Sequence, residues 1–371
     1  MRIVIDVGVL AHSRGGVARY TLGLARGVAA AAAADDSVTM VDVPASHAGA
    51  APPSEAREVL RDPLYLRMPL LRRIPLRSGS EARSRSRRLQ RLLGETDIYH
   101  HGGTQPFYPP SARSVLTLYD TSAWEHPEWH ASATLEYCRR ERLLVESGSR
   151  LLAISDWAAK RAERVLSLPR GSVGVAAGAA GAAFSPGPPS RKILEEHGLE
   201  ENGFLLHVGS YVPRKNIPML LAAYRGARDK GLRLPLVMVG AESWGGVKRP
   251  EGRGVISLSG TADSALLSLY RGARCLILPS RYEGLGLPVL EALACNTPVV
   301  CSDAAALPET LGGHGLLLDP DDTDRWVEAL AALSSVEYAG ELRELAGRAP
   351  ARGWADAGRD ALAFYREVLS E

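Results

Sequence analysis

The sequence predicts an α/β fold with two domains, each a parallel sheet covered by helices. The chain has 371 residues, which is the length of about two domains. Short β-branched runs alternate with longer Ala- and Leu-rich runs of helical period, and this alternation is typical of parallel strands joined by crossover helices. The same order of elements starts again after residue 203, which predicts a second domain built like the first.

In the first half, short apolar runs predict strands, which we expect at 2–7, 38–43, 96–99, 114–119 and 151–154. Apolar residues at helical spacing predict helices at 17–31 and 132–147, and Asp156 is expected to cap the start of a third. The segment 184–203 is rich in Pro and Gly near its start, so we expect it to link the two domains.

The second half repeats this order, with strands expected at 204–208, 235–239, 254–258, 275–278, 298–301 and 315–318. Helices are expected at 217–229, 263–272 and 287–295, and amphipathic helices follow from residue 323. The predicted domains are therefore 1–185 and 186–355, and a last helix at 356–371 is expected to pack back onto the first domain. Two such sheets bind ligands at the carboxyl ends of their strands, so we expect a binding cleft between the domains.

Composition excludes several classes of protein. Lys and Arg number 44 against 42 Asp and Glu, and the net charge of +2 gives no pull toward nucleic acid. The four cysteines show no paired spacing, which argues against a disulfide framework and a zinc site. The N-terminal run resembles a first strand, not a signal peptide, and no apolar stretch approaches the ~20 residues that span a bilayer. We therefore expect a soluble, cytoplasmic protein.

One segment, 61–94, is strongly basic, with ten arginines against two acidic residues and apolar side chains between them. The simpler interpretation is a solvated helical face with a loop around Gly79. The alternative is a patch that contacts anionic lipid headgroups or an acidic acceptor, which would place the protein at the inner face of a membrane.

The most informative motif is RYEGLGLPVLE, from Arg281 to Glu291. A predicted strand ends before a glycine-rich loop, and Pro288 then stands in the first turn of a helix. Glycines let backbone N–H groups approach a ligand closely, and the helix N-terminus attracts anions. Glu283 and Glu291 bracket this turn; because carboxylates repel phosphate, they are better suited to accept hydrogen bonds from ribose and sugar hydroxyls. Taken singly, each glutamate is also explained as a capping or solvated side chain.

Two further loops follow predicted strands. In HVGSYVPRKN (207–216), Gly209 permits a tight turn, and Arg214 and Lys215 are two adjacent cations suited to a diphosphate without a metal. In HSRGGV (12–17), the pair Gly15-Gly16 follows the first strand. A glycine pair is common in strand–helix turns, so alone it is a weak indication of a binding loop. The indication is stronger here because the pair is expected to face the other two loops.

Together these motifs resemble the large family of retaining glycosyltransferases with the GT-B fold, which has two facing Rossmann-like domains with a cleft between them. The resemblance is to the family 4, or group 1, type, which includes mannosyl- and glucosyltransferases of O-antigen, lipopolysaccharide and antibiotic-sugar assembly. It covers nearly the whole chain and rests on GGVARY from Gly15, on Gly209 with PRKN at 213–216, and on EGLGLPVLEALACNTPVVCSD from Glu283. The last motif is highly specific.

The resemblance implies a donor site for a nucleotide diphosphate sugar. It implies that Arg214 and Lys215 hold the diphosphate, that Glu283 contacts the donor sugar, and that Glu291 binds the ribose. Residues implied to line the donor through close backbone approach, backbone amides or contact with the base are Gly15, Gly16, Gly209, Gly284, Leu285, Gly286, Leu287 and Leu258. Such enzymes need no divalent metal, so the resemblance implies neither a metal site nor a cofactor.

Two positions depart from the family's pattern. Relatives usually have a His-Asp pair at the end of a first-domain strand, where this chain has Tyr119-Asp120. Relatives also tend to have Pro-Asn-Gly-Val before the linker, where this chain has the apolar stretch 175–184. The acceptor-side candidates are His101, Tyr119, Trp124 and His126, which we expect on first-domain loops.

The function implied is transfer of a hexosyl unit, with retention, from a GDP-mannose-like donor or a UDP-sugar to a hydroxyl of a glycan, lipid-linked or natural-product acceptor. No nucleophile is obviously placed for a double displacement, which favours attack on the face that the diphosphate leaves. The catalytic candidates are Lys215, Arg214, Glu283 and Asp120. A sugar-nucleotide epimerase is an alternative that the two-glutamate motif argues against. A non-catalytic nucleotide-sugar-binding partner of another transferase is a second alternative, favoured by Tyr119 and the stretch 175–184.

Overall fold

A computed structural model describes residues 1–11, 15–41, 65–66, 95–103, 113–241 and 246–371, which divide into two units. Unit 1 comprises the described residues of 1–121, 133–179 and 353–371, and unit 2 comprises those of 122–132 and 180–352. The main boundaries between the units follow residues 179 and 352, whereas the sequence predicted them after residues 185 and 355. The short segment 122–132 packs with unit 2, although the sequence assigned it to the first domain.

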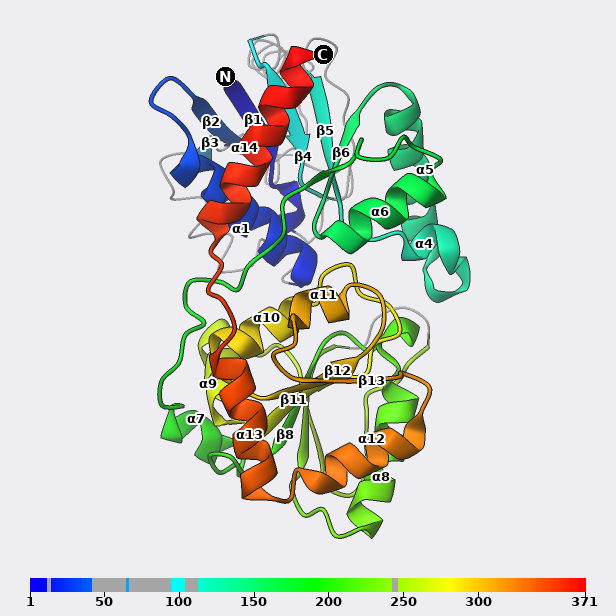
Figure 1. Cartoon of the computed structure of the whole chain (residues 1–371), viewed down its shortest axis with the longest axis vertical. Helices are drawn as coiled ribbons and strands as arrows, with labels where there is room; N and C mark the ends of the chain where they lie inside the picture. Colours follow the sequence, from blue (N-terminus) through cyan, green and yellow to red (C-terminus); the bar gives the residue numbers. More distant parts are fainter. Residues whose placement is uncertain (12–14, 42–64, 67–94, 104–112, 242–245) are drawn as a thin grey trace, which may run out of the picture. The chain divides into compact units, whose positions relative to one another are not determined.

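Among the described residues, unit 1 holds a seven-stranded parallel sheet in the order β3-β2-β1-β4-β5-β6-β7 (Figure 1). The strands are β1 (Arg2–Asp6), β2 (Ser37–Val41), β3 (Tyr65–Leu66), β4 (Ile98–His101), β5 (Arg113–Leu118), β6 (Arg150–Ala153) and β7 (Gly174–Val175). The helical segments are η1 (Gly8–Ala11), α1 (Gly16–Ala31), α5 (Ser132–Glu146), α6 (Asp156–Val165) and α14 (Trp354–Ser370).

Two local predictions in unit 1 are wrong. Strand β4 continues to His101, so His100 and His101 lie in the strand and are buried there, not in a loop. The cap of α6 is Ser155, whose hydroxyl accepts a 3.1 Å hydrogen bond from the Ala158 N–H, and Asp156 is the first helical residue.

Helix α14 packs along α1 (Figure 1). Glycines permit this close approach: a Cβ built on Gly27 would lie 1.9 Å from the carbonyl oxygen of Trp354, and one built on Gly358 would lie 2.1 Å from the backbone of Gly27. Because both obstacles are backbone atoms, neither helix accommodates a larger residue at the crossing without moving apart.

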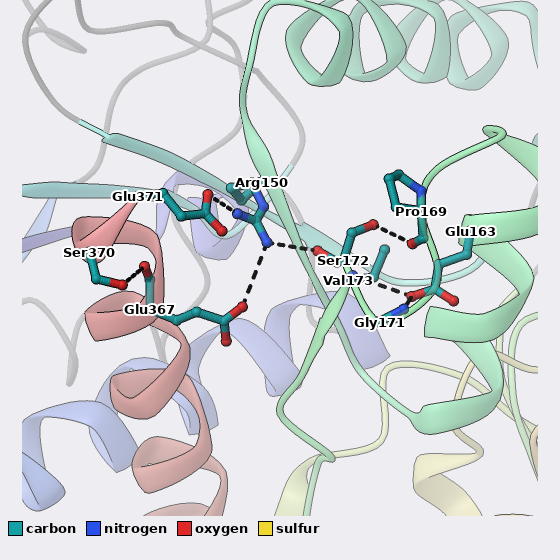
Figure 2. A network of polar contacts seen from close by, with 9 residues as sticks. All are labelled: Arg150, Glu163, Pro169, Gly171, Ser172, Val173, Glu367, Ser370 and Glu371. Carbon is teal, nitrogen blue, oxygen red and sulfur yellow. Dashed lines mark hydrogen bonds and ion pairs between the residues drawn. The ribbon is translucent and has the colours of Figure 1, made fainter.

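Arg150 anchors the end of α14 to the sheet (Figure 2). Its guanidinium donates to the Glu371 carboxylate and, over 3.1 Å, to the Ser172 carbonyl oxygen, and it lies 3.8 Å from Glu367. The contacts join the first residue of β6 to the last turn of the chain.

Unit 2 holds, within the described part of the chain, a six-stranded parallel sheet in the order β10-β9-β8-β11-β12-β13. The strands are β8 (Leu205–Val208), β9 (Leu236–Val239), β10 (Val255–Leu258), β11 (Cys275–Leu278), β12 (Val299–Ser302) and β13 (Leu316–Leu318). The helices are α4 (Ser122–Glu125), α7 (Arg191–Glu196), α8 (Ile217–Asp229), α9 (Asp263–Gly272), α10 (Leu287–Ala294), α11 (Leu307–Leu311), α12 (Thr323–Ala332) and α13 (Val336–Gly347), with short 3-10 turns η2 (Pro127–Trp129) and η3 (Pro213–Lys215).

Two apolar layers sandwich this sheet. On one face, α8, α12 and α13 bury a layer that includes Tyr224, Trp326 and Leu342 against the strands. On the other, α7, α9, α10 and α11 bury a layer that includes Leu194, Tyr270 and Val289. Strand order reverses between β8 and β11, which pair directly, so this is the topological switch point of the sheet. Ligands of such sheets bind at the carboxyl ends of the strands at this point.

Candidate nucleotide-sugar site

The loops that follow β8 and β11 bring Arg214, Lys215 and Glu283 together at the switch point. Arg214 Nη1 donates a 2.8 Å hydrogen bond to Glu283 Oε2, and Lys215 Nζ donates to Glu283 Oε1. The side chains of Lys215 and Glu283 are each only 7% exposed, while that of Arg214 is 22% exposed. Two cations around one carboxylate leave this buried cluster with a net positive charge.

Electrostatics keep Glu283 ionised. Burial alone would raise the pKa of its carboxyl, but the charges of Lys215 and Arg214, together with hydrogen bonds, lower it to about 2. Glu283 therefore keeps its negative charge across the physiological pH range. A buried positive site of this kind is suited to bind and stabilise a phosphate anion.

Local backbone structure holds the cations in place. Arg214 and Lys215 form η3, which ends at Asn216 in the left-handed region, at a φ of 56°. The Asn216 amide is fixed by a 2.8 Å bond to the Pro320 carbonyl oxygen. A Cβ built on Gly209 would lie 3.3 Å from Lys215 Nζ, so glycine at this position lets the ammonium lie against the end of β8.

The two loops are also joined through their backbones. The Arg281 N–H donates to the Arg214 carbonyl oxygen over 2.8 Å, and the Arg214 guanidinium donates to the Tyr282 carbonyl oxygen over 2.9 Å. Gly286 caps α10 in the left-handed region, at a φ of 89°, and Pro288 stands in the first turn. Residues Gly284, Leu285 and Gly286 are buried, and Leu287, the first residue of α10, is half-buried.

Glu291 lies on α10, one turn beyond the loop, and is also buried. Its Oε2 accepts a 2.7 Å hydrogen bond from the hydroxyl of Tyr270, the residue two positions before the end of α9. Tyr270 was not among the predicted site residues, because nothing in the spacing of 270 and 291 indicates that α9 and α10 meet there. Leu258 ends β10 on the same sheet and is half-buried.

Several of the remaining candidates belong to unit 1. In unit 1, Gly15 is the exposed N-cap of α1, Gly16 is its first residue, and Asp120 is half-buried after β5. His101 Nε2 pairs with Ser114 Oγ at 3.0 Å, and burial lowers the pKa of His101 to about 3. The Tyr119 hydroxyl donates to the Gly102 carbonyl oxygen over 2.5 Å and lies 2.6 Å from Thr21 Oγ1.

The segment 122–132 of unit 2 forms an aromatic and acidic cluster with Tyr282. The Tyr282 hydroxyl donates a 2.6 Å hydrogen bond to Glu125 Oε2. The rings of His126 and Trp129 stack at a centroid distance of 3.9 Å, and both meet Tyr282 edge-on. Trp124 is half-buried on α4. Since Tyr282 precedes Glu283, this cluster lies next to the charged site.

The described residues show neither a metal-ligand cluster nor a membrane-spanning helix. No group of three or more His, Cys, Asp or Glu side chains in that part of the chain is arranged to hold a metal ion. Among the helices described, none is both long enough and apolar enough to cross a bilayer. The arginine-rich segment 61–94 lies outside the described residues, apart from the two residues of β3.

The fold and the site together define a protein of two Rossmann-like units with a buried, positively charged cluster at the switch point of the second. The family described as "Glycosyl transferases group 1" matches residues 203–335, so this part of unit 2 is a group 1 glycosyltransferase domain. This confirms the resemblance seen in the motifs.

Curated relatives extend the match in sequence. The O-antigen chain mannosyltransferase B of Escherichia coli is 34% identical over 241 residues, which cover 62% of this chain and 63% of the relative. The D-inositol 3-phosphate glycosyltransferase of Frankia alni is 33% identical over 207 residues, which cover 50% of this chain and 51% of the relative. The aligned part of the chain thus spans between 51% and 63% of the length of these two relatives.

Solved structures match almost the whole chain. WaaG, a glycosyltransferase involved in lipopolysaccharide biosynthesis, has a TM-score of 0.69 at 16% identity and covers 98% of this chain and 99% of its own. A glycosyltransferase of Rickettsia africae has a TM-score of 0.67 at 14% identity, with 100% and 99% covered. HepE of Anabaena, in complex with UDP and glucose, has a TM-score of 0.65 at 15% identity, with 100% and 97% covered. These likenesses establish the fold alone, and they confirm the predicted GT-B class.

Proposed function

We propose that the chain is a retaining glycosyltransferase that moves a hexosyl unit from a nucleotide diphosphate sugar to an acceptor hydroxyl without a divalent metal. The observation that carries this proposal is the buried cluster of Arg214, Lys215 and Glu283 at the switch point of a group 1 glycosyltransferase domain. Two protein cations supply the charge that would otherwise come from a metal ion.

Each group has a defined task in this proposal. Arg214 and Lys215 bind the diphosphate, and the amides of 284–287 at the start of α10 add further donors. Glu283 accepts from a hydroxyl of the sugar, and Glu291, held by Tyr270, accepts from the ribose. As the bond to the sugar breaks, negative charge grows on the departing phosphate oxygen, and the fixed cations stabilise it there. That oxygen then takes the proton of the attacking acceptor hydroxyl on the same face.

We assign the acceptor to the side of Tyr282. The stacked pair His126–Trp129 and the ring of Tyr282 form a surface on which a sugar ring stacks, and the Glu125 carboxylate offers an acceptor for its hydroxyls. This arrangement supports a glycan acceptor over one without sugar rings. Asp120 remains a catalytic candidate by resemblance, whereas the hydroxyl of Tyr119 is occupied by the backbone of Gly102.

GDP-mannose is the first donor to test, because the PRKN and EGLGLPVLEA motifs resemble GDP-mannose-type members and a curated relative is named a mannosyltransferase. A thermal-shift panel of GDP- and UDP-sugars identifies the donor, since a ligand at about 100 times its Kd stabilises by about 2.7 kcal/mol. Transfer is then measured with EDTA present. Activity that EDTA abolishes and Mg²⁺ restores would contradict the metal-independent mechanism.

Lys215→Ala is the variant that separates the catalytic role from binding. We expect turnover to fall by about 10²–10³, the usual cost of losing one preorganised donor to a developing anion. Near-normal turnover would contradict the assignment. Wild-type chain that binds a sugar nucleotide but neither transfers nor hydrolyses it would favour the alternative, a non-catalytic partner of another transferase.

We also propose that the protein works in the cytoplasm and contacts the inner face of the membrane through segment 61–94. The ten arginines of that segment support this, because each basic residue near an anionic surface adds about 1 kcal/mol of attraction. Co-sedimentation with vesicles tests it: we expect binding that requires anionic lipid and declines with salt. Binding that ignores lipid charge would contradict it.

A further inference from the structure

His207 lies beside the charged site and has one ring nitrogen without a partner. It is in β8, and its side chain is fully buried. Nδ1 lies 3.0 Å from the carbonyl oxygen of Ile277 in β11. A carbonyl only accepts, so Nδ1 carries the proton, and in the neutral ring Nε2 is a bare acceptor. Among the described residues, Nε2 has no hydrogen-bond partner.

The position of His207 in the strand places it near Lys215. Gly209 directly follows Val208, the last residue of β8, and so lies two residues after His207. At Gly209 the space that a Cβ would take is bordered by Lys215 Cε and Nζ, at 3.2 and 3.3 Å. Burial lowers the pKa of His207 to about 4, and the charges of Lys215 and Glu283 both act on the ring. His207 is therefore a neutral acceptor within range of the charges of Lys215 and Glu283.

Binding of the donor diphosphate would change the hydrogen-bond partners of the Lys215 ammonium. In the structure, the Glu283 carboxylate is occupied by both Lys215 and Arg214. A diphosphate competes with this carboxylate for the same two cations. An ammonium has three N–H donors, so Lys215 is able to serve a phosphate and a second acceptor at once. A buried acceptor without a partner costs about 1–3 kcal/mol. A hydrogen bond from one N–H of the Lys215 ammonium to His207 Nε2 would remove this cost.

We propose that His207 is a positioning residue for Lys215: its Nε2 accepts a hydrogen bond from the Lys215 ammonium when the donor diphosphate draws that ammonium away from Glu283. The exchange holds Lys215 on the phosphate and leaves Glu283 to bind the sugar. This inference rests on the proposed function.

Two substitutions of His207 test the roles of its two ring nitrogens separately. His207→Asn keeps a donor at the place of Nδ1, and so keeps the bond to Ile277, but it has no acceptor at the place of Nε2. His207→Gln reaches the place of Nε2 with its carbonyl oxygen. Binding of GDP and UDP is measured by calorimetry, and kcat and KM are measured with the donor that the panel identifies. His314→Asn and His314→Gln are the matched controls, because His314 Nδ1 also bonds a backbone carbonyl, that of Leu345 at 3.1 Å, away from the site.

We expect H207N to bind the nucleotide about 10-fold or more weakly, since hydrogen bonds to charged groups contribute about 1.5–3 kcal/mol, and H207Q to stay within about threefold of the wild type. Equal affinities for H207N and wild type, or losses that are the same in both variants, would overturn the inference. If wild type binds no nucleotide, the proposed function fails and the inference fails with it; if wild type binds and transfers, only the inference is in question.

A measurement on the wild type avoids any effect on folding. With ¹⁵N-labelled histidine, the unprotonated Nε2 of His207 gives a long-range NMR signal assigned by its loss in H207N. We expect GDP or UDP to shift this signal upfield, as accepting a hydrogen bond does, while the signal of Nδ1 keeps its position. An Nε2 signal unchanged at saturating nucleotide would overturn the inference.

Discussion

The hydroxyl of Tyr270 donates a 2.7 Å hydrogen bond to Oε2 of Glu291, and both residues are buried. The bond joins α9 to α10 and fixes the direction of the carboxylate that we assign to the ribose. Thr297 Oγ1 donates a 2.7 Å hydrogen bond to the Tyr270 carbonyl oxygen, and this bond connects Tyr270 to the chain beyond α10.

Tyr270→Phe should therefore weaken nucleotide binding without removing the carboxylate. We expect the Kd for the preferred nucleotide to rise about 10-fold, because one hydrogen bond to a charged group contributes about 1.5 kcal/mol. Calorimetry gives the Kd, and Tyr365→Phe is the control, since Tyr365 is a buried tyrosine of unit 1. An unchanged Kd in Y270F would show that Tyr270 does not orient Glu291.

Glu283 should make stability depend on acid pH. The ordinary pKa of 4.5 falls to about 2 in the folded chain, so the contribution of Glu283 is fully present above about pH 4.5 and is lost as pH falls toward 2. A shift of this size corresponds to about 3 kcal/mol. Urea unfolding of wild type and Glu283→Gln between pH 5 and 3 measures it: the free energy of unfolding should fall more steeply in the wild type. Parallel slopes would contradict the assigned pKa.

Glu141, in unit 1, should make stability depend on pH in the opposite direction from Glu283. The Tyr137 hydroxyl lies within hydrogen-bond distance of Glu141 Oε1, at 2.8 Å, and of the Gly103 carbonyl oxygen, at 3.0 Å. A phenol has one hydrogen, so both contacts are hydrogen bonds only when the carboxyl is protonated and donates. Burial, with the charge of Asp120 adding to it, raises the pKa of Glu141 to about 8 against the lowering effect of the bonds from Tyr137 and Cys138.

The folded chain therefore holds a proton on Glu141 that the unfolded chain releases above pH 4.5, and stability falls as pH rises toward 8. Between pH 6 and 8 we expect the ionisation of Glu141 to lower the free energy of unfolding by about 2–3 kcal/mol. Glu141→Gln is neutral throughout, so this pH dependence should be absent from the variant. Thermal unfolding at pH 6 and pH 8 compares the two chains. A wild-type slope that survives in E141Q would place the titration elsewhere.

Two helical glycines should respond in opposite ways to alanine. Gly27→Ala puts a Cβ against the Trp354 carbonyl oxygen and should destabilise the chain by about 1–3 kcal/mol. Gly340 in α13 is exposed and has no atom within 4 Å of such a Cβ, so Gly340→Ala should stabilise by about 0.5–1 kcal/mol through helix propensity. Chemical denaturation measures both changes. Equal effects would mean that the crossing of α1 and α14 is looser than described.

Much of the fold was predictable from local patterns. The bounds of α8 and α9 match the predicted 217–229 and 263–272, because each helix has a regular apolar face between clear breakers. The two-residue strands β3 and β7 were not predicted, since so short a pairing has no periodicity of its own. The third strand was expected to end at residue 99, which left His100 and His101 in a loop. Partners from elsewhere in unit 1, Tyr365 for His100 and Ser114 for His101, allow both to be buried in β4.

The site was only partly predictable, because some of its contacts join side chains from distant parts of the chain. The sequence singled out Arg214, Lys215 and Glu283 from their motifs, and the structure brings the three together. It did not identify Tyr270, nor the bond from Tyr282 to Glu125, 157 positions away. Such partners belong to different elements, and single-sequence spacing carries no information about which side chains meet across a sheet or a helix pair.

The most direct test of the account is a crystal structure of the chain with its preferred sugar nucleotide. We predict density for the diphosphate against Arg214, Lys215 and the amides of 284–287, for the ribose at Glu291 and for the sugar at Glu283. Nucleotide density at another place, with the start of α10 unoccupied, would contradict the account.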